Sequence, residues 1–387
     1  MDTSKYYFVF LGTGCSSLSI IMRMIESHNF SQKKILLIDK EEKTKNDRTW
    51  CFWEKDAGFF DEIVFKKWHN LNFKTDDLTI ALDIDPYTYK MIRGIDFYNF
   101  CFKRIRQQDN IDVIYGNISF GENVSSNRVF YNGQDLAFRK EVIIFNSIFS
   151  PPKAAKNKFY LLQHFKGWIV ETPVPFFHPE EATLMDFRTS QIHGTTFFYI
   201  LPLSSTRALI EYTLFSEKLL DSQDYDKALQ EYCDRNLSLK NYTIVNEEFG
   251  VIPMTNAFFP HYFNGMYNIG TAGGQTKAST GYTFQFIQKQ ATLVVEKLNQ
   301  DKLIPEIKKT LSRFDFYDST LLHILSKKIM TGKKIFSILF QENDAFLVLK
   351  FLDNQTTITE EYRLLNTLPK KTFLTAGIKE LMKMLPF

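Results

Sequence analysis

Closely spaced cysteines are missing from this 387-residue sequence. Cys15, Cys51, Cys101 and Cys233 stand far apart and form no CxxC pair. A disulfide-stabilised scaffold pairs many cysteines in a short chain, so we expect a protein of the reducing cytoplasm. The seven histidines are also scattered, without an HxxxH or HExxH pattern. We therefore expect no metal site.

Long apolar runs and strong charge are missing as well. No window approaches about 18 uninterrupted apolar residues, so we expect no membrane-spanning helix. The first residues, MDTSKYYFVFLGTG, lack the charged start and the cleavage site of a signal peptide. The net charge is +3, and no basic block is interleaved with stacking aromatic residues. The sequence therefore predicts no nucleic-acid partner.

Phenylalanine, by contrast, is abundant. The chain has 38 Phe, and aromatic residues make up 16% of a composition that is otherwise ordinary, with 44% hydrophobic and 24% charged residues. Two interpretations stay open: an AT-biased genome that enriches Phe and Lys together, or an aromatic-lined cavity for a large apolar ligand. The length allows one large domain or two closely packed ones.

The N-terminal segment has the order of a dinucleotide-binding unit. A strand expected over residues 5–11 runs into the turn GTGCSS, which is followed by helical spacing over 19–26 and by a second strand over 34–38. Strand, glycine turn, helix and strand in this order are typical of a Rossmann phosphate site.

Four residues of this unit are candidates for cofactor binding. Gly12 allows the tight turn, and Gly14 lets the backbone approach a pyrophosphate at the helix N-terminus. Asp39 ends the second strand, where a carboxylate accepts hydrogen bonds from ribose hydroxyls. Ser17 stands at the third position of the pattern, where a glycine usually mediates helix–strand packing.

A second glycine cluster lies far downstream. Gly270, Gly273 and Gly274 follow an expected strand and precede a helical pattern over 283–298. FAD enzymes use such a late segment for a second approach to the cofactor, so the two clusters together favour FAD over NAD. The alternative is an ordinary loop at Gly273-Gly274.

Between these clusters the chain has the pattern of antiparallel strands. Strands are expected over 159–163, 168–172, 195–201, 207–213 and 245–252, and a helix over 224–236. The sequence predicts a mixed α/β fold with a discontinuous cofactor domain over 1–150 and 245–300. A β-rich substrate domain over 151–244 and a helical region over 301–387 complete it.

A lone carboxylate stands in one of these apolar strands. Strand alternation places Leu209, Glu211 and Thr213 on one face, and Ala208, Ile210 and Tyr212 on the other. An acid in such a strand must face water, a partner or a site that uses it.

Several segments together resemble the flavin-dependent lycopene cyclases of the bacterial type. They occur in that family's order across most of the chain and read NDRTWCFW (46–53), QHFKGW (163–168), MDFR (185–188), FYILPL (198–203), LIEYT (209–213), GVIP (250–253) and the stretch from Gly270 to Tyr282. The resemblance implies a flavoprotein fold of the hydroxylase type and a carotenoid substrate, lycopene. It also implies formation of β-ionone rings without net oxidation, although reduced FAD is required, with NAD(P)H as the expected reductant.

The resemblance also implies site residues. Glu211 matches an acid implicated in acid–base chemistry, whereas Tyr212 replaces a second acid of the family's motif. Either Glu211 alone carries the proton, or the ring regiochemistry and rate differ here. Asn146-Ser147 also departs from the family's pattern, so no role is assigned there.

The remaining site candidates come with simpler alternatives. Asp186 and Arg188 are catalytic candidates that orient the flavin or the acid, or else form a structural salt bridge at a strand end. Arg48 is a candidate for the cofactor or substrate entrance. Aromatic faces at Trp168, Phe198 or Tyr199 are candidates for stabilising a cation.

The C-terminal segment mixes lysines with apolar residues over 370–387. It fits an interfacial helix that contacts the cytoplasmic membrane peripherally, or an ordinary helix packed on the core. A substrate that dissolves in lipid favours the membrane contact.

The rival functions are a flavin monooxygenase or dehydrogenase acting on an apolar substrate, and a binding protein without chemistry. The oligomeric state stays open.

Overall fold

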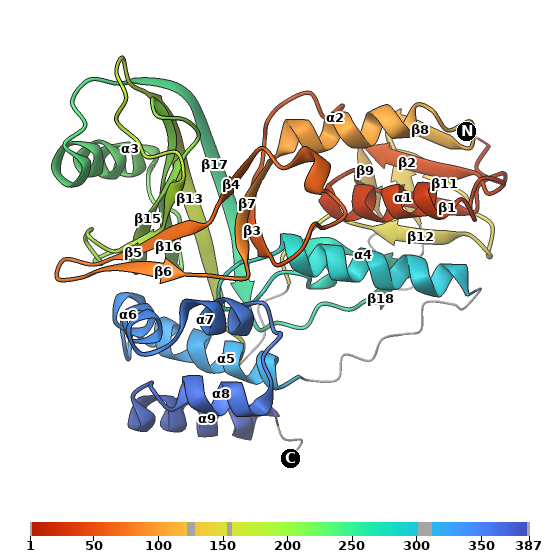
Figure 1. Ribbon diagram of the computed structural model, residues 1–387. Coiled ribbons are helices and arrows are strands. Elements are labelled where there is room, and N and C mark those ends of the chain that lie inside the picture. Colours follow the sequence, from red (N-terminus) through yellow and green to blue (C-terminus); the bar gives the residue numbers. More distant parts are fainter. Residues whose placement is uncertain (1, 122–127, 153–156, 301–311, 385–387) are drawn as a thin grey trace.

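A six-stranded sheet forms the N-terminal half of the fold (Figure 1). The computed structural model describes residues 2–121, 128–152, 157–300 and 312–384. The strand order is β18-β19-β12-β1-β2-β8, and all neighbours are parallel except the β18–β19 pair. The strands are β1 (Phe8–Leu11), β2 (Ile35–Asp39), β8 (Ile111–Tyr115), β12 (Ile143–Asn146), β18 (Tyr262–Phe263) and β19 (Met266–Asn268).

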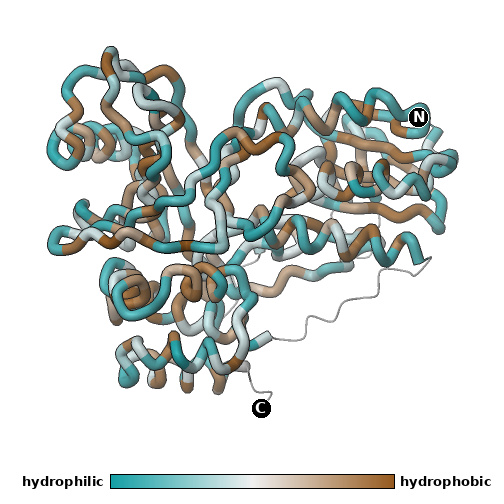
Figure 2. The backbone as a smooth tube through the Cα atoms, in the orientation of Figure 1, coloured by the Kyte–Doolittle hydropathy of each residue, from teal (hydrophilic) through white to brown (hydrophobic). Residues whose placement is uncertain are grey.

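Both faces of this sheet are covered. One face packs on α1 (Cys15–Ser27), α2 (Gly94–Ile105) and α4 (Phe284–Asn299). The other packs on a small sheet of β9 (Ile118–Phe120), β10 (Val129–Tyr131) and β11 (Gln134–Leu136). Every residue of β1 and β2 is therefore buried, and the central strands of this half are hydrophobic along their length (Figure 2).

A seven-stranded sheet forms the second half, in the order β17-β13-β16-β15-β14-β5-β6. It is antiparallel apart from the β14–β5 pair. The strands are β5 (Asn70–Lys74), β6 (Thr79–Asp83), β13 (Tyr160–Glu171), β14 (Glu181–Asp186), β15 (Thr195–Pro202), β16 (Arg207–Ser216) and β17 (Thr243–Thr255). One face packs on α3 (Ser222–Tyr232), which continues into a π-helical turn over Cys233–Leu237.

The opposite face of the large sheet packs on the C-terminal helices and on a three-stranded sheet. That sheet consists of β3 (Thr49–Glu54), β7 (Thr88–Arg93) and β4 (Lys66–Trp68), with a 3-10 turn at Asp61–Ile63. The C-terminal helices are α5 (Arg313–Ser326), α6 (Gly332–Glu342), α7 (Ala345–Leu352), α8 (Ile358–Leu365) and α9 (Lys370–Met384). The helical region expected from residue 301 is thus present from 312 on, and 301–311 lie outside the described residues.

The division into segments differs from the expected one in two places. Residues 70–83, expected in the cofactor domain, form β5 and β6 of the large sheet, because Leu71, Phe73 and Leu82 are buried in the core that this sheet shares with the C-terminal helices. The expected boundary at 244/245 falls inside β17. The strands expected over 159–163 and 168–172 are one continuous strand, β13.

Candidate active site

A cavity of about 450 Å³ lies where the two large sheets meet. We call it the acid cavity. It reaches from the start of α1 to β13, β15, β16 and β17, past the carboxyl ends of β1 and β12. Ligands of open α/β sheets bind at this end of the strands. Its polar and ionisable lining includes Ser16, Lys43, Asp47, Arg48, Thr49, Cys51, Tyr89, Tyr199, Glu211, Glu248 and Tyr282.

The two glycine segments lie against each other at one end of the acid cavity. Gly12 has φ +88°, and a Cβ there would lie 2.4 Å from the Ser147 Oγ. A Cβ at Gly270 would lie 2.5 Å from the Ser16 Oγ, so the downstream segment Gly270–Gly273 packs directly on the start of α1. Gly14 lines the cavity, and a Cβ there would meet nothing within 4 Å. The backbone is thus open to a ligand at Gly14.

The start of α1 suits an anionic group. No side chain caps its first amides, and its first turn contains no acidic residue. Helix N-termini of this kind attract phosphate. Ser17 is fully buried, and its hydroxyl lies 3.3 Å from that of Ser147 beyond β12. It therefore occupies the contact between helix and sheet, where a larger side chain would not fit.

Asp39 stabilises the glycine turn through hydrogen bonds. Its Oδ2 accepts hydrogen bonds from the Thr13 amide at 2.6 Å and the Thr13 hydroxyl at 2.8 Å, and Lys43 lies 3.2 Å from Oδ1. Burial acts to raise the pKa of Asp39, but these partners outweigh it and lower the pKa overall. Asp39 is therefore a carboxylate that fixes the turn.

The other two downstream glycines shape the turn without lining the cavity. Gly273 packs so closely that a Cβ would lie 2.3 Å from the Asn268 carbonyl oxygen. Gly274 has φ +75°, a conformation that favours glycine. Thr271 of this segment lines the acid cavity, and so does Gly281 further along the chain.

At the other end of the acid cavity two glutamates face each other across a glycine. Glu211 on β16 and Glu248 on β17 are both paired with Gly167 of β13, the strand between them. Glu211 Oε1 accepts a hydrogen bond from the Thr213 hydroxyl at 2.8 Å, and Glu248 Oε2 accepts one from the Thr49 hydroxyl at 2.6 Å. A Cβ at Gly167 would lie 3.0 Å from Glu248 Cγ. The missing side chain is what lets the two carboxyls meet.

The two carboxyls differ in protonation. Burial raises the pKa of Glu211 well above its ordinary value, and the charge of Glu248 raises it further. Burial also raises the pKa of Glu248, but hydrogen bonds from Thr49 and Glu211 and the charge of Arg48 oppose this effect. Both pKa values are raised overall, that of Glu211 more strongly, so a proton held by the pair resides on Glu211 and the charge on Glu248.

Sequence reasoning missed Glu248. The residue stands two positions before the GVIP segment, in a strand whose first residues are exposed. Its proximity to Glu211 depends on the register of three strands that are distant in sequence. One signal was available in the sequence. Glu248, Gly250 and Ile252 are alternate positions of one strand and therefore share a face, and all three line the cavity.

Asp186 and Arg188, expected as catalytic candidates, do not line the acid cavity. Asp186 is fully buried, and the Arg188 guanidinium binds it through Nη2 at 2.6 Å and Nε at 3.0 Å. The Tyr232 hydroxyl of α3 donates to the same carboxylate at 2.6 Å. The pair therefore faces α3, on the opposite side of the large sheet from Glu211, and forms the structural salt bridge.

Strand alternation also places the aromatic candidates on two different faces of the large sheet. Tyr199 is paired with Glu211 and lines the acid cavity. Phe198 and Trp168 point to the α3 face, and so does Tyr212, whose ring stacks on Phe198 with centroids 4.9 Å apart. Phe198 and Trp168 are thus not available to a cation in the cavity. The departure at Tyr212 likewise leaves the cavity side unchanged.

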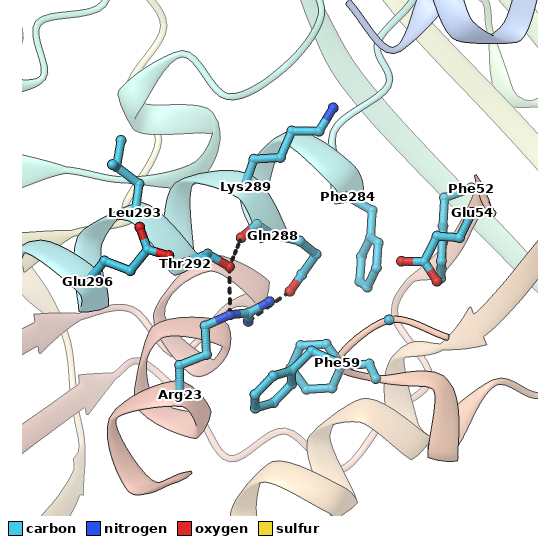
Figure 3. A pocket seen from close by; sticks show the side chains of 12 residues that line it. Arg23, Phe52, Glu54, Phe59, Phe284, Gln288, Lys289, Thr292, Leu293 and Glu296 are labelled. Carbon is cyan, nitrogen blue, oxygen red and sulfur yellow. Dashed lines mark hydrogen bonds between the residues drawn. The ribbon is translucent and has the colours of Figure 1, made fainter. Parts of the chain in front are cut away.

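Another cavity, of about 410 Å³, lies between α1, α4 and the loop at Phe59 (Figure 3). We call it the outer cavity. Arg23 donates from Nε to the Thr292 hydroxyl and from Nη1 to Gln288 Oε1, both at 3.1 Å, and its guanidinium lies 4.3 Å from the Phe59 ring centroid. Burial lowers the pKa of Arg23 to about 10, which leaves it charged at neutral pH. None of the predicted site residues lines this cavity, so we place the candidate active site at the acid cavity.

Several solved structures share the fold. A flavin-dependent brominase aligns with TM-score 0.60 and 14% identity over 98% of this chain and 100% of that chain. A geranylgeranyl bacteriochlorophyll reductase-like protein from Thermoplasma acidophilum gives 0.56 and 11% over 99% and 100%. A p-nitrophenol 4-monooxygenase from Pseudomonas putida gives 0.56 and 10% over 97% of each chain. These similarities confirm the mixed α/β fold of the flavoprotein monooxygenase and halogenase type.

No curated protein sequence matches the chain significantly. The model of the lycopene cyclase protein family, in contrast, matches residues 8–377. This range contains both glycine segments, both glutamates and the helices α5 to α8, and therefore nearly the whole fold described above. The chain belongs to the lycopene cyclase family.

Proposed function

We propose that this protein is a lycopene cyclase that converts the linear ends of lycopene into β-ionone rings, giving γ- or β-carotene, with reduced FAD bound. The observation that carries the proposal is the position of Glu211, whose pKa burial raises, in a cavity that also reaches the open backbone at Gly14 and the start of α1. Membership of the lycopene cyclase family supports the carotenoid substrate. The reaction is an isomerisation without net oxidation or reduction.

The residues of the cavity fit FAD. The uncapped start of α1, the open backbone at Gly14 and the glycine segment packed beside it offer a site for the pyrophosphate. Arg48 lies in the same cavity and would hold the cofactor or the substrate at its entrance. The fold neighbours named as flavin-dependent enzymes support the same cofactor. We propose NAD(P)H as the source of its electrons.

Cyclisation needs a proton on the terminal double bond of the substrate, and Glu211 is placed to donate it. A glutamic acid ordinarily has a pKa near 4.3 and would be ionised at pH 7. Burial and the neighbouring charge of Glu248 keep Glu211 protonated instead. The Thr213 hydroxyl donates a hydrogen bond to Glu211 Oε1 and so orients the carboxyl. The register of β16 and β17 on β13 places this carboxyl across Gly167 from Glu248.

A raised pKa makes Glu211 a weaker acid, so the cation must be stabilised as it forms. Tyr199, paired with Glu211, presents an aromatic group in the cavity, and cation–π attraction contributes about 2 kcal/mol in a desolvated site. The carboxylate of Glu248 adds a negative charge nearby. When bound, reduced FAD supplies a further negative charge that favours the cation electrostatically.

The lipid-soluble substrate also requires a route from the bilayer, and we propose that α9 supplies it. Leu374, Ile378, Leu381 and Met382 are about half exposed or more and follow helical spacing along one side of α9. Lys371 and Lys379 are exposed on the same helix. The buried side of α9 packs on α5, at the outer edge of the helical region (Figure 1). This pattern fits peripheral contact with a membrane surface.

No helix among the described residues is both long and apolar enough to cross a membrane. We propose a cytoplasmic protein that touches the cytoplasmic membrane through α9.

Anaerobic incubation with lycopene in liposomes, FAD and a reductant tests the proposed reaction. We expect cyclised carotenes, with NAD(P)H needed only to reduce the flavin and not consumed in step with product. Hydroxylated product or stoichiometric consumption of NAD(P)H would instead identify a monooxygenase or dehydrogenase. Bound carotenoid without any conversion would identify a binding protein.

A further inference from the structure

Glu248 has one oxygen that no amide, hydroxyl or cationic group of the described residues satisfies. Its Oε2 accepts a hydrogen bond from the Thr49 hydroxyl, whereas its Oε1 is buried and receives none from such groups. Glu211 lies across Gly167 from it, in the same row of the sheet. A proton on Glu211 is the donor that satisfies this oxygen. The pair therefore needs one proton to be complete.

We infer that Glu248 is a second catalytic residue, which shares one proton with Glu211 and removes the proton from the newly closed ring. The inference deepens the proposed function and rests on it. Glu248 lines the same cavity as Glu211, so both carboxyls face the same bound molecule. The family's second acid is replaced by Tyr212, which faces α3. In this chain the second carboxyl of the cavity comes from β17 instead.

The proposed steps balance without an oxidant or a reductant. Glu211 gives its proton to the terminal double bond of the substrate, where a C–H bond forms and a carbocation results. The electrons of a second double bond form the ring C–C bond and move the cation into the ring. Glu248 then removes a proton from the adjacent ring carbon, and the electrons of that C–H bond form the ring double bond. The proton returns to Glu211 through the contact between the two carboxyls.

The groups around the pair leave few competing charges. The titratable groups that line the cavity with the two glutamates include Arg48, Cys51 on β3, Tyr89 on β7, Tyr199 on β15 and Tyr282 before α4. Burial raises the pKa of the Cys51 thiol and of the Tyr89 and Tyr199 hydroxyls well above their ordinary values, and that of Tyr282 to about 12. All four are neutral at pH 7. The charge of Arg48 favours the ionised form of Glu248. Lys43 and Asp47 also line the cavity, and Lys43 is paired with Asp39.

The test compares Glu248→Gln with Glu247→Gln in the FAD-loaded enzyme. Glu247 is the preceding residue on β17, and its carboxylate pairs with Lys166 at 3.0 Å on the other face of the sheet. Glutamine at 248 keeps the size of the side chain but neither accepts a proton nor carries charge. Three readouts are needed: cyclase activity across pH, flavin content, and the infrared band of the protonated carboxyl titrated without substrate.

We expect Glu248→Gln to lower kcat by about 10²–10⁴-fold even at acid pH, where Glu211 is fully protonated, because a general base contributes this much. The carboxyl band should titrate at lower pH than in the wild type, since a neighbouring charge is gone. Glu247→Gln should change neither quantity. Full activity of Glu248→Gln at acid pH would overturn the inference and leave the proposed function intact. Failure of the wild type to cyclise lycopene would instead refute the proposed function.

Discussion

Glu211 and Glu248 occupy one row of the seven-stranded sheet, each directly paired with Gly167 on the strand between them. Neighbouring strands lie about 4.8 Å apart, so residues on two strands flanking a third are normally separated by a side chain. Glycine removes that side chain. Two acids from strands that are distant in sequence thereby become a single protonated pair in the cavity.

The role of Glu211 predicts a large loss of activity on removal of its proton. Glu211→Gln should lower kcat by about 10²–10⁴-fold, the usual contribution of a general acid, while flavin binding and the melting temperature are preserved. The matched control is Glu171→Gln, because Glu171 forms an exposed ion pair with Arg207 and lies outside the acid cavity. Retention of full activity with reduced FAD bound would show that Glu211 is not the acid.

The glycine between the acids predicts a second effect. In Gly167→Ala the new methyl would lie 3.0 Å from Glu248 Cγ and 2.8 Å from Leu209 Cδ1, so the neighbouring side chains have to shift. We expect Glu248 to move away from Glu211. The pKa of Glu211 should fall, and the alkaline limb of the pH–activity profile should shift to lower pH. Leu209→Ala is the control, because it changes the other side chain that the new methyl would contact. It should leave the alkaline limb in place. An unshifted limb in Gly167→Ala would mean that the distance between the acids is unimportant.

For the Asp186–Arg188 pair we predict a loss of stability without a loss of activity, the opposite of the result expected for Glu211→Gln. Asp186→Asn removes the charged acceptor shared by Arg188 and Tyr232, and should lower the free energy of unfolding by about 1.5–3 kcal/mol. The turnover of the remaining folded enzyme should be unchanged. Chemical denaturation and kcat measured on the same preparation check this. A loss of kcat at unchanged stability would restore a catalytic role for Asp186.

Local sequence patterns were sufficient for the cofactor end of the fold. The turn at Gly12 and the end of β2 at Asp39 lie within one contiguous unit, where spacing alone sets the geometry. The helix α1 begins at Cys15, earlier than the helical spacing expected over 19–26. Alternation also placed Glu211 and Tyr212 on opposite faces correctly. These are properties of a single segment.

Contacts between distant segments were not visible in the sequence. Glu248 meets Glu211 only because β17 and β16 flank β13 in one register. Asp186 is two residues from Arg188 in sequence, but its hydrogen bond from Tyr232 of α3 joins segments that are distant in sequence. The hairpin of β5 and β6 joins the large sheet through a parallel pairing with β14, a strand far along the chain.

The raised pKa of Glu211 also predicts how stability depends on pH. The folded protein binds this proton more tightly than the unfolded chain, so from about pH 4.3 upward the folded state holds more protons than the unfolded state. Glu211 therefore makes the free energy of unfolding fall as pH rises, until the pH exceeds the raised pKa. Urea denaturation across pH should show a shallower fall in Glu211→Gln. An identical pH dependence in both proteins would contradict the raised pKa.

The apolar side of α9 predicts binding to vesicles. The triple change Leu374→Lys, Ile378→Lys and Leu381→Lys should reduce sedimentation with liposomes at least about tenfold, because burial of each such side chain contributes roughly 1.5–3 kcal/mol. Activity on detergent-dispersed lycopene should be unaffected. Ile192→Lys, at an exposed position away from α9, is the control. Unchanged vesicle binding in the triple variant would place the membrane contact elsewhere.

The most direct test is the mass of the carotenoid formed in the first turnover of protein equilibrated in D2O, with reduced FAD and no oxygen. Proton donation from Glu211 and proton removal by the pair predict an isomer of lycopene that carries one deuterium for each ring formed. A product with added oxygen, a product with two additional hydrogens, or a ring without deuterium would contradict the account.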